Sequence, residues 1–97
     1  MKDYEIVQAA VCRVTGISKT KLLSRSRRWP IIEARMLFVL FLSRLGKDDQ
    51  RLACLLGRDR TTVLKARHNA EDYILISKSF NDKFSKIKEF YGTAKSV

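Results

Sequence analysis

Apolar residues recur along most of this chain at intervals of three and four positions, which is the spacing of one face of an α-helix. The face nearest the N-terminus consists of Ile6, Val7, Ala10, Val11 and Val14. It predicts a helix from about Asp3 to Thr15. Further helices are expected over about residues 19–23, 30–45, 48–56, 60–77 and 79–91. Since no stretch shows the alternation and paired turn residues of a β-hairpin, the pattern predicts an all-α fold, a small bundle of about six helices.

The most apolar stretch is the middle of the predicted 30–45 helix. Every residue from Met36 to Leu42 is apolar, but this run is far shorter than the ~20 residues of a membrane span. A helix that is apolar on all sides is typical of a central helix contacted from several directions. The alternative is that this segment, 36–42, stays exposed and docks a protein partner or forms a homodimer, so that the protein is an interaction adaptor.

Glycine, proline and capping residues mark the ends of the predicted helices. Gly16, Gly46 and Gly57 each follow a helix, and Pro30 suits a first turn because it has no amide hydrogen to lose there. The short helix before Gly57 and the longer helix after it form the pattern of a helix-turn-helix. N-caps are expected at Ser18, at Asp48 or Asp49, at Asp59 and at Ser79.

Length and charge indicate the number of domains and the class of partner. The chain has 97 residues, enough for one domain, which we place over 1–97 with a core of about 4–91 and a frayed end at 92–97. Its 20 Lys and Arg residues outnumber its 10 Asp and Glu residues, so the formal net charge is +10. A charge of that size on a small domain favours a polyanionic partner such as DNA.

The positive charge is densest over residues 19–28, which carry five basic residues and no acidic one. This run lies between two apolar helices and ends at Trp29 and Pro30, so we expect a short tethered loop. A basic run is often only a solvated face. An arginine loop of this kind can also reach phosphates or a narrow minor groove, and the net charge favours that interpretation.

Other function classes find little support in the residues. Cys12 and Cys54 make no disulfide framework or zinc motif, and we expect both side chains to be buried in the protein. The expected compartment is a reducing cytoplasm. There the protein would associate with the nucleoid. His68 is the sole histidine and has no evident acid and nucleophile beside it, so we expect no enzyme, metal or cofactor. The N-terminus lacks the apolar segment of a signal peptide, and no membrane association is expected.

The start of the predicted 60–77 helix has the residue types that read bases. Arg can meet guanine or phosphate, Asp can accept a hydrogen bond from cytosine, and a Thr methyl can meet a thymine methyl. Residues Arg58 to Thr62 supply all three kinds. They suit a helix inserted into the DNA major groove, although an ordinary amphipathic helix can also begin with a polar turn.

Leu52 to Ala66, with the core Arg-Asp-Arg-Thr-Thr-Val, resembles the signature of the C-terminal DNA-binding domain of the bacterial replication initiator DnaA. The resemblance extends backwards through Leu22-Leu23-Ser24, the arginine loop and Ala34-Arg35, and it covers roughly residues 4–90. It implies a Trp-repressor-like helical fold whose recognition helix, about 60–77, reads double-stranded DNA in the major groove. It also implies a role in replication origin binding or its regulation.

The resemblance implies roles for individual residues as well. Base contacts fall to Asp59, Thr61 and Thr62, with Arg60 beside them. Arg27, or its neighbour Arg25, would enter the minor groove. Arg58 would orient Asp59 or touch the DNA backbone. The expected contacts to the DNA backbone are Lys21, Arg28, Arg35, Arg58 and Lys65.

The chain also departs from the family pattern. The family has a histidine where Arg60 stands, so the base sequence recognised here can differ. Leu56 replaces one glycine of the usual pair, and Trp29 occupies a commonly basic loop position, where we expect it to pack. No G-x-x-x-x-G-K-[ST] motif occurs, which leaves no P-loop for a nucleotide and no ATPase. The chain is therefore expected to be either a stand-alone paralogue of the domain, of mobile-element origin for example, or a fragment, and its Met1 start favours the stand-alone protein.

Overall fold

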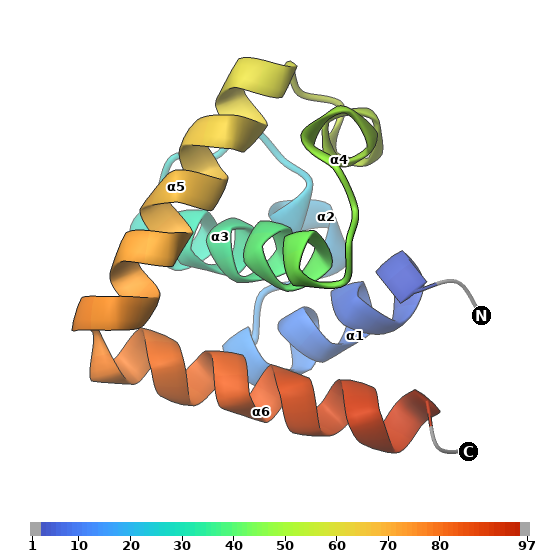
Figure 1. Ribbon diagram of the computed structural model, residues 1–97, viewed down its shortest axis with the longest axis vertical. Helices are drawn as coiled ribbons and strands as arrows, with labels where there is room; N and C mark the ends of the chain where they lie inside the picture. The colour runs from blue at the N-terminus through green and yellow to red at the C-terminus, as the bar shows by residue number, and fades with distance from the viewer. Residues whose placement is uncertain (1–2, 96–97) are drawn as a thin grey trace.

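The computed structural model describes residues 3–95 and shows six helices in this part of the chain (Figure 1). They are α1 Asp3–Thr15, α2 Lys19–Leu22, α3 Trp29–Arg44, α4 Asp49–Leu56, α5 Arg60–Ile76 and α6 Lys78–Lys95. No strand occurs within residues 3–95. The predicted all-α bundle with a helix-turn-helix is confirmed, and the largest difference in bounds is at the end of α6.

Helix α3 lies at the centre of the domain and packs against each of the other five helices. Every residue from Met36 to Leu42 is buried, with exposed fractions of 0–6%. Burying one large apolar side chain contributes roughly 1.5–3 kcal/mol, so this segment is a main source of stability. It presents no docking surface, and the structure does not favour the adaptor alternative that required one. Within residues 3–95, the exposed large apolar residues lie elsewhere, at Trp29, Leu45, Leu75 and Ile76.

The last helix, α6, runs beside α1 along one side of the domain (Figure 1). Its aromatic residues belong to the core, as the helical spacing indicates: Phe41 of α3 meets Phe84 and Tyr91 at ring-centroid distances of 5.5 and 5.2 Å. The helix continues past the expected limit at residue 91, because Asp3 of α1 accepts hydrogen bonds from the Tyr91 hydroxyl and the Lys95 ammonium. Only residues 96 and 97 of the expected frayed end lie outside the described residues.

Local capping sets the helix starts. Ser18, Asp48 and Asp59 each accept a hydrogen bond from the backbone amide three residues ahead, as predicted. The expectation for Ser79 is wrong, because α6 already begins at Lys78 and the Ser77 hydroxyl accepts the amide of Phe80 at 3.2 Å.

The two cysteines differ in burial. Cys12 packs partly against the core, but Cys54 is exposed, contrary to expectation. Helix α4 buries Leu52, Ala53 and Leu56, and Cys54 lies two positions after Leu52, on the opposite side of the helix.

Candidate nucleic-acid interface

The corner between α4 and α5 is a tight turn built from one glycine and one aspartate. Gly57 has φ 63°, a left-handed conformation that costs other residues roughly 1 kcal/mol or more. Two residues later, Asp59 Oδ1 accepts the amide of Thr62 at 2.7 Å. That hydrogen bond keeps the pKa of the Asp59 carboxyl below its usual value. The turn therefore starts α5 abruptly and leaves a charged carboxylate at its tip.

The first turn of α5 faces away from the core. Arg60, Thr61 and Thr62 are exposed, whereas Val63 is 1% exposed and anchors the helix. Lys65 is also exposed, one turn further along. The expected base-reading residues are thus exposed to solvent, on a helix that Val63 anchors to the core.

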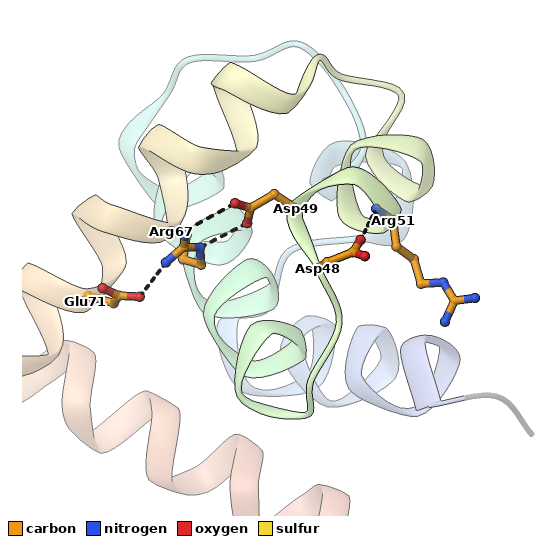
Figure 2. A network of polar contacts seen from close by, with 5 residues as sticks. All are labelled: Asp48, Asp49, Arg51, Arg67 and Glu71. Carbon is orange, nitrogen blue, oxygen red and sulfur yellow. Dashed lines mark hydrogen bonds and ion pairs between the residues drawn. The ribbon is translucent and has the colours of Figure 1, made fainter.

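An ion-pair network sets the position of α5 against α4 (Figure 2). The Arg67 guanidinium donates to both carboxylate oxygens of Asp49, at 3.0 and 3.2 Å, and to Glu71 at 3.0 Å. Arg67 keeps the pKa of Asp49 below its usual value, and Asp49 in turn raises the pKa of Arg67. The sequence did not reveal this pair, because the partners lie 18 positions apart and no local pattern joins them.

The basic loop between α2 and α3 alternates inward serines with outward arginines. Ser24 and Ser26 are half-buried, whereas Arg25, Arg27 and Arg28 are exposed. The serines bind the loop backbone: the Ser24 hydroxyl donates to the Lys21 carbonyl at 2.7 Å and accepts the Ser26 amide at 3.3 Å, and the Ser26 hydroxyl accepts the Arg28 amide. The loop is therefore ordered by its own serines.

Arg35 has a structural role that the sequence did not predict. Its Nε donates to the Leu22 carbonyl at 2.9 Å, its Nη1 to the Ser26 carbonyl at 2.7 Å, and its Nη2 to the Ser24 carbonyl. Burial, and then the nearby charge of Arg58, lower the pKa of this guanidinium, although arginine stays protonated in proteins. The expected phosphate donor is thus directed at the inside of the basic loop.

Arg58 joins the same loop from the other side. Its Nη2 donates to the Ser24 carbonyl at 2.5 Å, and its Nη1 makes longer contacts to the carbonyls of Leu56 and Gly57. Its hydrogen bonds are thus to backbone carbonyls and do not orient Asp59. Arg58 therefore connects the turn of the helix-turn-helix to the basic loop, across 34 positions of sequence.

A cleft of about 640 Å³ lies between the basic loop and the start of α5. The structure brings together here several residues that the sequence singled out. Other candidates lie outside this lining. Arg60, Thr61 and Lys65 are exposed on α5, Lys21 lies on α2, and Arg28 is the last residue of the basic loop. The cleft is lined by Arg25, Arg27, Ile32, Arg35, Gly57, Arg58, Asp59 and Thr62.

Trp29 closes one side of the basic loop. Its side chain is 48% exposed, and its ring lies 5.4 Å from that of Tyr73 on α5. Packing against Tyr73 accords with the expectation from the sequence. The position of the basic loop is therefore coupled to α5 through an aromatic contact as well.

Residues 3–95 contain neither a membrane-spanning helix nor a cluster of metal-binding side chains. None of the helices described is both long and apolar enough to span a bilayer. Within residues 3–95, no three His, Cys, Asp or Glu side chains form a group suited to a metal ion.

Comparison with known families gives one match. Residues 4–69 fit the family model described as the bacterial dnaA protein helix-turn-helix. The matched segment runs from α1 through the first part of α5 and includes every candidate DNA contact named above. No curated protein and no solved structure matches the chain.

Proposed function

Because the chain belongs to the bacterial DnaA helix-turn-helix family, we propose that it recognises a particular base sequence in double-stranded DNA. Membership of this family supports DNA binding in general, because it is a family of DNA-binding domains and not of catalytic ones. The finer proposal is that α5 enters the major groove while the basic loop contacts the adjacent minor groove.

One observation carries this proposal, namely that the basic loop and the start of α5 line a single cleft. In duplex DNA a single sugar-phosphate strand separates a major groove, about 12 Å wide, from a minor groove, about 6 Å wide. A strand seated in the cleft would have α5 on its major-groove side and Arg25 and Arg27 on its minor-groove side. Arginines inserted into a narrow minor groove gain from its negative potential.

The exposed residues then divide into base readers and phosphate contacts. Arg60, Thr61 and Thr62, which are exposed in the first turn of α5, would meet base edges. Asp59 uses Oδ1 as the N-cap, which leaves Oδ2 as an acceptor for a cytosine amino group. The phosphate contacts are Lys21, Arg28, Arg58 and Lys65.

Arg60 is the residue by which the recognised base sequence would differ from that of the family, which has a histidine at this position. A histidine offers one or two ring nitrogens, whereas the guanidinium is a fork suited to the O6 and N7 atoms of guanine. We therefore expect a guanine at the position that Arg60 reads. The process we propose is binding at a replication origin, or regulation of that binding.

Selection of bound duplexes from a random pool, followed by titration at several salt concentrations, tests the proposal. Thr62→Ala should weaken binding to the selected sequence by about 1–3 kcal/mol and leave binding to random DNA unchanged. Thr93→Ala is a matched control, because Thr93 is exposed on α6, away from the cleft. Equal losses on selected and random DNA would contradict base reading, and a pool without enrichment would contradict sequence recognition altogether.

A further inference from the structure

The position of Arg35 is unusual for a DNA-contacting arginine. It lies on α3, and its guanidinium donates to the carbonyl of Leu22, the last residue of α2, and to the carbonyls of Ser24 and Ser26 in the basic loop. Along the loop, the half-buried Ser24 and Ser26 alternate with the exposed Arg25 and Arg27. The Arg35 guanidinium thus holds the loop backbone from the core side, while Arg25 and Arg27 stay exposed to solvent.

The Ser24 carbonyl is the point at which two arginines converge. It accepts hydrogen bonds from Nη2 of Arg35 and from Nη2 of Arg58. Arg35 belongs to the central helix, and Arg58 belongs to the turn before α5. One carbonyl of the basic loop is thus held to the core and to the helix-turn-helix together, which fixes the loop relative to the recognition helix.

Neither guanidinium is neutralised by an acid. The ion pairs within residues 3–95 involve Lys47, Arg67, Lys83 and Lys95 as cations, and include neither Arg35 nor Arg58. Two like charges at one carbonyl repel each other, and the positive potential they leave in the cleft attracts phosphate. Arg35 and Arg58 therefore both hold the loop and attract the DNA strand.

We infer that Arg35 is a positioning residue: together with Arg58 it holds the basic loop in its DNA-binding conformation before DNA arrives, and it is not a phosphate contact. Pre-ordering matters because a loop that must be ordered on binding costs conformational entropy at that step. This inference rests on the proposed function for its consequence in DNA binding. Whether the basic loop is ordered in the free protein does not depend on the proposed function.

The test separates charge from shape. Arg35→Lys keeps the positive charge, but an ammonium cannot reach three carbonyls spread along the loop. Arg44→Lys is the matched control, because Arg44 lies exposed at the other end of α3, with its guanidinium over Phe84. Circular dichroism and urea unfolding establish that each variant is folded.

The first measurement is trypsin cleavage of the free protein after Arg25, Arg27 and Arg28. Arg35→Lys should cleave about tenfold faster there than the unaltered protein, because local opening exposes the loop, and Arg44→Lys should not. An unchanged rate for Arg35→Lys would overturn the inference. Backbone order parameters for residues 25–28 of the unaltered protein test it even if the variant fails to fold: about 0.8 supports it, and a value below about 0.6 overturns it.

The second measurement is binding to the selected duplex as a function of salt. A positioning role predicts that Arg35→Lys loses about tenfold or more in affinity, whereas a phosphate contact would tolerate lysine with little loss. Faster cleavage without DNA binding by any of the proteins would support the positioning role and refute the proposed function. Unaltered cleavage together with unaltered binding would refute the positioning role and leave the proposed function intact.

Discussion

Helices α3 and α5 are similar in length but make opposite use of their surfaces. In α3, ten of 16 residues are buried, and they surround the helix on all sides. In α5, only Val63 and Ala70 of 17 residues are buried. The central helix is thus used mainly for packing, whereas α5 has few buried residues.

This difference in burial predicts how the two helices contribute to stability. Side chains on α3 are surrounded by other apolar groups, so truncating them leaves cavities. Arg60, Thr61 and Thr62 at the start of α5 are exposed, so truncating them leaves no cavity. The exception on α5 is Arg67, whose ion pair with Asp49 fixes the helix (Figure 2). We expect large losses of stability on α3 and small ones at the start of α5.

The largest effect is expected for Phe38→Ala. Phe38 is 1% exposed at the middle of α3, and removal of a buried Phe side chain costs about 3–5 kcal/mol of the free energy of unfolding. Leu75→Ala is the control on α5, because Leu75 is 84% exposed, and it should change the free energy by less than about 0.5 kcal/mol. Urea unfolding measures both, and equal losses would contradict the division between the two helices.

Asp49→Asn should cost about 1–2 kcal/mol at neutral pH, because it removes a bidentate, half-buried ion pair. The pKa of Asp49 is lower in the folded protein, so the unfolded state binds the proton more readily. The contribution is therefore complete above the unfolded pKa of about 3.9 and lost as the pH falls through the lower folded pKa. Urea unfolding from pH 7 to pH 2 should show the two proteins converging in acid.

The exposed Asp72 on α5 provides the control for that experiment. Asp72→Asn should leave the stability at pH 7 within about 0.5 kcal/mol of the unaltered protein. A difference between Asp49→Asn and the unaltered protein that stays constant down to pH 2 would mean that the ion pair does not hold α5 to α4.

Asp59→Ala should lower the melting temperature by a few degrees, because it removes the N-cap of α5. Asp59→Asn should preserve the melting temperature, since asparagine caps equally well, but it should still impair discrimination at the proposed cytosine. Calorimetry and titration with matched and mismatched duplexes separate the two roles. If the two variants have equal melting temperatures, the cap does not contribute measurably to stability.

Lys65→Ala is expected to have the smallest effect on stability, within about 0.5 kcal/mol, because Lys65 is exposed on α5. It should nevertheless lower the slope of log affinity against log salt by about 0.9, the value for one lost phosphate contact. Lys78→Ala, at the start of α6, is the control. An unchanged salt slope for Lys65→Ala would remove Lys65 from the DNA interface.

The sequence by itself determined the helices, most of their caps and the surface position of the candidate base readers. These features depend on residues three or four positions apart: the spacing of apolar side chains, Asp59 capping Thr62, and a left-handed Gly57. Such local interactions are readable from the order of residues. The clustering of arginines between residues 19 and 28 likewise indicated a polyanionic partner without any knowledge of the fold.

Only the tertiary structure decided what the long side chains do. Arg35 reaches carbonyls up to 13 positions away, Arg67 pairs with Asp49 across 18 positions, and Arg58 reaches Ser24 across 34. An arginine side chain has several rotatable bonds and five donors, and its sequence position alone does not say whether it meets phosphate, carboxylate or carbonyl. The fold made that choice by placing the Ser24 carbonyl between α3 and the turn before α5.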